Sequence, residues 1–168
     1  MKKLFLFFLT IMMVSSCEDS IEITTTTSIN ESLDVSIPQT NGSAVAFDET
    51  ITQDLSQVVL NFNSINDISI DNLSYKFINL TGNTNALLTS ATIEINQNII
   101  ANISNVDISQ EVTNASVFYI TDTEVLDQLE TMFLNNSFVT IRLYGMALTD
   151  EDDVSFEIEV STQLTATL

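Results

Sequence analysis

Residues 154–168 read VSFEIEVSTQLTATL, and this stretch decides the fold. Its alternate positions share one parity and hold Val154, Phe156, Ile158, Val160, Thr162, Leu164, Ala166 and Leu168. Ser, Thr, Glu and Gln occupy the positions between them. Successive side chains of a strand point to opposite faces of a sheet, whereas a helix would distribute the same residues around its axis. The stretch therefore predicts one long strand with a buried and a solvated face, and we expect this last strand to close the fold.

Shorter runs with alternating or β-branched residues come before it. They cover residues 21–29, 33–37, 43–52, 73–78, 91–95, 99–103, 117–120 and 139–143. Asn41-Gly42 is a turn dipeptide, and Asn96-Gln97-Asn98 lies between two of the runs as expected for a hairpin. Turn signals at short intervals, without a regular alternation of strands and helices, predict an antiparallel β-sandwich of about eight or nine strands with one or two short helices.

Two segments have helical spacing. Thr121-Asp122-Thr123-Glu124 fits a capping box in which Thr121 is the N-cap and Glu124 reaches back to it. The apolar face that follows consists of Val125, Leu126, Leu129, Met132 and Phe133. We therefore predict a helix over residues 122–135. Residues 55–65 also have helical spacing after Asp54, but their alternation fits a strand as well.

The composition is strongly acidic. The 168 residues include 23 Asp and Glu against four Lys and Arg, which gives a formal net charge of −19. Such a charge repels the phosphates of nucleic acids and favours cations and basic partners, so we expect no nucleic-acid partner. The chain is also 45% hydrophobic, a content that an acidic disordered tail lacks. We therefore predict a folded, acidic domain.

The first residues have the features of an export signal. Met1-Lys2-Lys3 is cationic, and residues 4–14 form an apolar run that is shorter than the roughly 20 residues a membrane span needs. Val14-Ser15-Ser16-Cys17 resembles the lipobox that signal peptidase II reads in bacterial lipoprotein precursors. This resemblance implies cleavage before Cys17, diacylglycerol on its sulfur and an acyl chain such as palmitate on its amine, an anchor held by several chains.

The residues after Cys17 extend the resemblance. Glu18 and Asp19 resemble the acidic surface-export signal of lipoproteins in the Bacteroidota, although they also suit a solvated spacer. Asp19-Ser20-Ile21 is similar to the O-glycosylation site of that group. The whole pattern is similar to small uncharacterised surface lipoproteins of the Bacteroidota, and this implies no particular activity.

These resemblances divide the chain into three parts and locate it. We expect a signal peptide at 1–16, a lipidated terminus and spacer at 17–20, and a single β-sandwich domain at 21–168. The localisation implied is the outer membrane after export, with the domain held there by lipid on Cys17 and facing the cell exterior if Glu18 and Asp19 act as the export signal.

The sequence lacks the residues that most catalytic mechanisms need. The sequence has no histidine, and its one cysteine is Cys17, so neither a Ser-His nor a Cys-His pair nor an internal disulfide can form. The three glycines, at 42, 82 and 145, cannot make a phosphate-binding loop. Lys76 is the one lysine outside the expected signal peptide, and we expect it to be solvated or ion-paired. We nominate no catalytic residue and expect no enzymatic activity.

Two alternatives depend on carboxylates. Four acids in a row precede the last strand, and Asp150, Asp152 and Asp153 are candidate calcium ligands, with Glu157 and Glu159 extending the acidic surface. The string lacks the spacing and glycine of an EF-hand loop, and an acidic turn in water also explains it. A carboxylate-based hydrolase would need two acids in opposed environments within a cleft.

The leading hypothesis is therefore a lipid-anchored, non-enzymatic interaction or structural module. It requires no cofactor, and its protein or glycan partner is not identified by the sequence. A calcium-binding or calcium-stabilised surface domain is the first alternative, and the hydrolase is the second.

Overall fold

The computed structural model describes residues 23–58, 64–82, 86–149 and 152–168. The expected signal peptide, Cys17, the export residues Glu18 and Asp19, and the calcium candidate Asp150 lie outside the described residues. Within the described ranges, no helix is long and apolar enough to cross a membrane.

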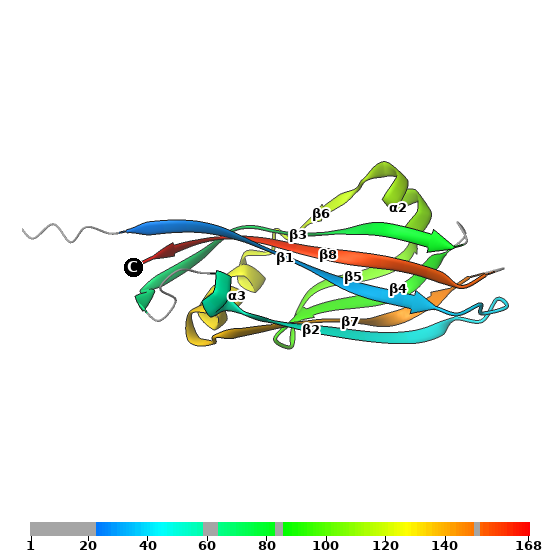
Figure 1. The fold of residues 1–168 in the computed structure, drawn as a ribbon, viewed down its shortest axis with the longest axis horizontal. Helices are drawn as coiled ribbons and strands as arrows, with labels where there is room; N and C mark the ends of the chain where they lie inside the picture. The colour runs from blue at the N-terminus through cyan, green and yellow to red at the C-terminus, as the bar shows by residue number, and fades with distance from the viewer. Residues whose placement is uncertain (1–22, 59–63, 83–85, 150–151) are drawn as a thin grey trace, which may run out of the picture.

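The described residues form two four-stranded antiparallel sheets that pack face to face (Figure 1). Sheet A has the order β1 (Thr24–Ile37), β8 (Val154–Thr167), β3 (Asp67–Gly82) and β6 (Val117–Tyr119). Sheet B has the order β2 (Val45–Asp54), β7 (Phe138–Leu148), β4 (Leu87–Ile95) and β5 (Asn98–Asp107). The helices are α1 (Leu55–Val58), α2 (Ile108–Asn114) and α3 (Thr123–Asn135). The predicted antiparallel β-sandwich is confirmed.

The strand β8 has the predicted character and an interior position. It pairs with β1 along one edge and with β3 along the other, over nearly its whole length. Its apolar side chains are buried, and so is Thr162, which shares their parity. The polar side chains of the other parity are intermediate or exposed, as the alternation predicts. The strand therefore closes the fold from the middle of sheet A, not from an edge of the sheet.

One apolar core joins both sheets and the helices. Its largest fully buried side chains are Phe77, Phe133, Phe156, Ile37, Leu55, Leu73, Leu88, Ile93, Ile95, Ile108, Leu129 and Leu143. On the β3–β6 side, the rings of Tyr75 and Phe118 stack with centroids 4.9 Å apart. Because the chain's single cysteine excludes an internal disulfide, this core must supply most of the stability.

The sequence predicted two strands, at 21–29 and 33–37, where the structure has the single strand β1. The prediction was wrong because Glu31 interrupts the apolar alternation of Ile29 and Leu33. Glu31 has the inward parity of those neighbours, yet it is only partly buried. Since β1 is an edge strand, an inward carboxylate there stays near water, and the strand continues through it.

The predicted hairpin between β4 and β5 is confirmed. Asn96 and Gln97 connect the strands and both have positive φ, at 46° and 71°. Two such residues make the tight turn whose twist matches that of the flanking strands. The Asn96 side chain also accepts a hydrogen bond from the backbone N of Thr140, at 2.6 Å, and so fixes the turn against β7.

The predicted helix at 122–135 is confirmed as α3, with a different N-cap. Asp122 is the cap, and its Oδ1 accepts hydrogen bonds from the backbone N of Glu124 and Val125, at 3.0 and 3.3 Å. Asp122 therefore takes the role that the sequence analysis gave to Thr121. A carboxylate at this position also interacts favourably with the positive end of the helix dipole.

The other two helices are short. From the ambiguous segment 55–65 the structure describes the four residues of α1 as α-helical, and residues 59–63 lie outside the described ranges. The sequence analysis missed α2, which begins after the cap Asp107 and ends at Ala115, a left-handed residue with φ of 50°. Ile108 is the one buried residue of α2, and seven residues give too little periodicity to detect.

Gly145 permits a close approach between β7 and β4. It lies opposite Ala91 in the register, beside an irregularity between Leu88 and Ser90. A Cβ on Gly145 would collide with the carbonyl oxygen of Ser90 and with the Cα of Ala91. Because both of these atoms belong to the backbone, rotation of a side chain cannot relieve the collision.

We expect the substitution Gly145→Ala to destabilise the protein by about 1–3 kcal/mol, the usual cost of overpacking. The free energy of unfolding in urea measures this cost. The control is Thr50→Ala on the exposed face of β2, which should change stability by less than about 0.5 kcal/mol. Equal stability of the Gly145→Ala variant and the control would contradict the close approach of the two strands.

Candidate functional site

The strand β7 presents three large side chains on the outer face of sheet B: Arg142, Tyr144 and Met146. Their neighbours Leu143 and Ala147 have the opposite parity and are buried. β7 lies between β2 and β4, so each outward residue has one partner on either side. The candidate site is therefore assembled by register from three strands that are far apart in the sequence.

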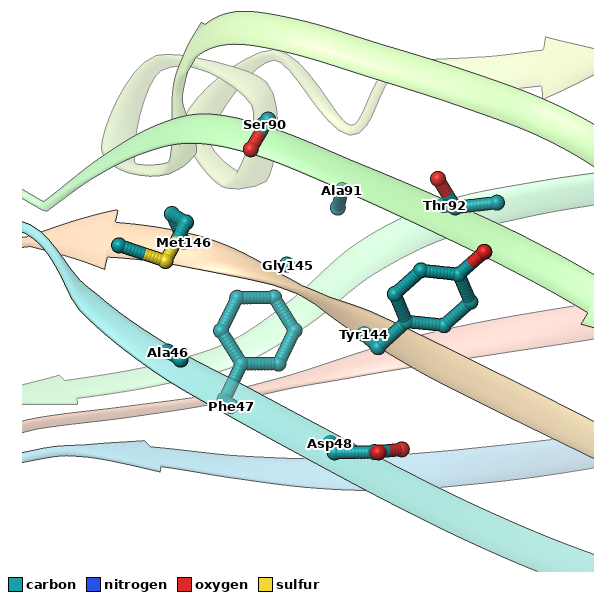
Figure 2. Close-up of a pocket in the computed structure, with 9 residues that line it drawn as sticks. All are labelled: Ala46, Phe47, Asp48, Ser90, Ala91, Thr92, Tyr144, Gly145 and Met146. Carbon is teal, nitrogen blue, oxygen red and sulfur yellow. The ribbon is translucent and has the colours of Figure 1, made fainter.

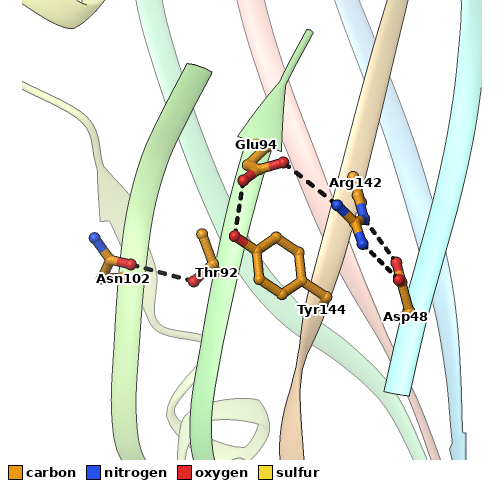
Figure 3. A network of polar contacts seen from close by, with 6 residues as sticks. All are labelled: Asp48, Thr92, Glu94, Asn102, Arg142 and Tyr144. Atoms are coloured by element: carbon orange, nitrogen blue, oxygen red, sulfur yellow. Dashed lines mark hydrogen bonds and ion pairs between the residues drawn. The ribbon is translucent and has the colours of Figure 1, made fainter. Parts of the chain in front are cut away.

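The register places two carboxylates beside Arg142 (Figure 3). Its Nε and a terminal nitrogen donate to the two carboxylate oxygens of Asp48, at 2.8 and 2.6 Å. Its other terminal nitrogen lies 3.9 Å from Glu94 Oε2. A forked guanidinium–carboxylate pair has a defined geometry as well as charge, so Arg142 is held in one orientation between β2 and β4.

Tyr144 is fixed at both its hydroxyl and its ring. The hydroxyl donates to Glu94 Oε1 at 2.7 Å. The guanidinium carbon of Arg142 lies 4.5 Å from the centroid of the Tyr144 ring, which is cation–π geometry. Next to this cluster, Thr92 donates to Asn102 Oδ1 at 3.2 Å. Figure 3 shows these six residues on the neighbouring strands β2, β7, β4 and β5, with the Thr92–Asn102 pair beside the cluster around Arg142.

The contacts set the protonation states of the cluster. The hydrogen bond from Arg142 holds the pKa of Asp48 below its ordinary value, and the same bond raises the pKa of Arg142. The hydrogen bond to Glu94 raises the pKa of the Tyr144 phenol above its ordinary value of 10.0. At neutral pH, Asp48 is therefore an anion, Arg142 is a cation, and Tyr144 keeps the proton that it donates to Glu94.

A hollow of about 510 Å³ lies beside Tyr144 on this face (Figure 2). Its walls include Tyr144 and Met146, and the small residues Ala46, Ser90 and Gly145 leave space between them. Figure 2 shows Gly145 between the side chains of Met146 and Tyr144. We refer to this depression as the sheet B hollow. An aromatic wall, a thioether and nearby polar groups suit a ligand with both apolar and hydrogen-bonding surface.

The candidate calcium residues that the structure describes lie in the turn before β8. Asp153 Oδ1 accepts from the backbone N of Gln39 at 2.9 Å, and the backbone carbonyl of Asp152 accepts from the Thr149 hydroxyl at 2.9 Å. Asp153 thus connects this turn to the segment after β1. Within the described ranges, no three His, Cys, Asp or Glu side chains are grouped as metal ligands would be. Calcium binding stays a prediction.

The outer face of sheet A contains the remaining residues named from the sequence. Lys76 forms an ion pair with Glu159 at 2.8 Å, which confirms the expected ion-paired lysine. The side-chain amide of Asn79 donates to Glu157 Oε1 at 2.7 Å. Glu157 and Glu159 therefore take part in cross-strand contacts of sheet A.

The cluster of Asp48, Glu94, Arg142 and Tyr144 was not foreseen from the sequence. Strand parity alone shows that Arg142 and Tyr144 share a face of the sheet. Their contacts with Asp48 and Glu94 depend on the order β2-β7-β4, which a single sequence does not specify. The one sequence signal for this cluster was Arg142, a charged residue inside the β-rich run at 139–143.

Comparison with known proteins adds no family to these observations. No protein-family model matches the chain, and a search of curated proteins finds no similar sequence. The proposals below therefore depend on the residues of this chain.

We expect the substitution Glu94→Gln to lower the pKa of Tyr144 toward its ordinary value, because a neutral amide accepts the hydrogen bond of the phenol less strongly than the carboxylate does and also repels the phenolate less. Because the pKa of Tyr144 is higher in the folded than in the unfolded protein, this contact adds to the free energy of unfolding below about pH 10. The contribution is lost as the pH rises through the pKa of Tyr144 in the folded protein. Absorbance titration of the tyrosines, with Asp127→Asn on α3 as the control, measures the shift. An unchanged titration curve in Glu94→Gln would contradict the contact.

Proposed function

We propose that the chain is the precursor of a lipid-anchored lipoprotein of the outer membrane or cell surface, and that its β-sandwich is a non-enzymatic interaction module. The ligand binds at the sheet B hollow. The observation that carries the binding proposal is the fixed position of Tyr144, which Glu94 and Arg142 hold beside an open depression. A side chain that is already ordered loses little conformational entropy when a ligand binds, and this favours affinity.

The anchor is supported by the lipobox-like Val14-Ser15-Ser16-Cys17 and by the short distance in sequence to the folded domain. The strand β1 begins at Thr24, seven residues after Cys17. Seven fully extended residues reach at most about 25 Å, which is less than the length of most domains. A lipid on Cys17 would therefore keep the sandwich close to the membrane surface.

The non-enzymatic part of the proposal is supported by the chemistry of the cluster. The two carboxylates nearest the sheet B hollow, Asp48 and Glu94, both interact with Arg142. Because Arg142 lowers the pKa of Asp48, that group is ionised at neutral pH and is unsuited to act as a general acid. The residues of the cluster are thus better arranged for recognition than for proton transfer.

The substitution Cys17→Ala should abolish incorporation of labelled palmitate and release the protein from the membrane fraction, because the thioether-linked lipid can no longer form. Labelling in growing cells, followed by fractionation and immunoblotting, measures both effects. Ser28→Ala, in β1, is the control and should behave like the parent protein. Labelling or membrane retention of the Cys17→Ala variant would refute the lipid anchor.

The substitution Tyr144→Ala should weaken ligand capture at least about tenfold, the size of effect expected for a buried aromatic contact at a binding site. In the assay, the purified parent protein and each variant are incubated with solubilised cell envelope, and the amount of each species that they retain is compared. Tyr119→Ala is the matched control, because Tyr119 is an exposed tyrosine (61%) on β6 of the other sheet. Equal capture by both variants and the parent would show that the sheet B hollow is not the binding site.

A further inference from the structure

The two sides of the sandwich are closed differently. On one side, α2 and α3 contact both β3 and β5, and the Glu130 carboxylate of α3 accepts from the backbone N of Ile70 at 2.7 Å. On the other side, β1 and β2 are the outermost strands of their sheets and contact each other. No described strand pairs with their outer edges. We call these two edges, with the gap between them, the open side.

Each strand of the open side has one inward-facing carboxylate. Glu31 in β1 lies opposite the buried Val160, and Glu49 in β2 lies opposite the buried Leu143. Both glutamates are partly buried. Neither side-chain carboxylate forms a hydrogen bond or an ion pair with any other described residue, although the main chains of both residues pair with the neighbouring strands. Two carboxylates therefore occupy positions on the inner faces where an apolar residue would continue the core.

One of the two glutamates, Glu49, lines a gap between β1 and β2. Leu33, Asp34, Glu49 and Ile51 line a shallow gap of about 190 Å³ on this side. Glu31 precedes Leu33 by two positions on the same face of β1. The open side thus combines unpaired main-chain groups with an acidic, partly apolar gap.

The cations of the described residues do not neutralise this gap. Lys76 pairs with Glu159, and Arg142 pairs with Asp48 and Glu94. These two residues are the only Lys and Arg in the described ranges. A cation that neutralised this gap would therefore have to come from outside the described residues.

An open strand edge tends to pair with another copy of itself, and inward charges are one means of preventing this. A second β1 would bring its own Glu31 to the edge, and like charges on adjacent strands are unfavourable. A strand with Lys or Arg at the inward positions would instead form ion pairs with the partly buried Glu31 and Glu49. The same carboxylates thus exclude self-pairing and select a basic strand.

We infer that the open side binds an extended basic segment of a partner protein, which adds to β1 as a fifth strand of sheet A. Main-chain hydrogen bonds along the 14 residues of β1 supply affinity, and Lys or Arg side chains facing Glu31 and Glu49 supply selectivity. This inference rests on the proposed function, since it assumes an interaction module. It concerns a different surface from the sheet B hollow.

The test uses the intact chain in a neutral detergent and a labelled ten-residue peptide of alternating Lys and Thr. Fluorescence anisotropy gives its dissociation constant. The double variant Glu31→Gln with Glu49→Gln keeps the side-chain shape, and we expect it to weaken binding at least tenfold. The control, Asp127→Asn with Asp152→Asn, removes the same charge from exposed positions outside β1 and β2, and should weaken binding less than twofold.

Amide exchange of β1 should also slow when the peptide binds, and urea unfolding of both double variants checks that they are folded. Equal weakening by the two double variants, or an unchanged exchange rate in β1, would overturn the inference, because binding would then reflect only the overall charge. If the peptide fails to bind while the Cys17 and Tyr144 variants lose anchoring and capture, the basic-strand inference falls and the proposed function stands.

Discussion

The central constraint on this structure is the position of β8 between β1 and β3. Its two edges pair with β1 and β3, so the strand connects the two halves of sheet A. Its apolar face lies against sheet B and so forms part of the core. With a single cysteine there is no covalent substitute for this packing. The core uses the inner faces of the sheets, and their outer faces and the free edges of β1 and β2 stay accessible.

Those surfaces are predominantly acidic. The described residues contain two cations, and both already have carboxylate partners. Arg142 organises the outer face of sheet B, because it orients Asp48 on one neighbouring strand and contacts Glu94 and Tyr144 on the other side. The unneutralised acids elsewhere favour neutral or basic partners.

The sequence predicts the elements that local patterns specify. Three local patterns each predict their own element: the alternation at 154–168, the apolar face of α3 and the Asn-rich turn at residue 96. Features that depend on pairing were missed. Glu31 made one strand look like two, because its inward position is tolerable only at a sheet edge. The cluster around Tyr144 likewise requires the strand order, which brings residues 48, 94 and 144 together.

Native-state hydrogen exchange of the intact chain without any partner tests the central claim that β8 is interior while β1 and β2 are open. We expect the β8 amides to exchange only through global unfolding, and the alternate amides of β1 and β2 that point to the free edges of the sheets to exchange much faster. Uniform protection of β1 and β2 at the level of β8 would contradict it, because the edges would then be covered in solution.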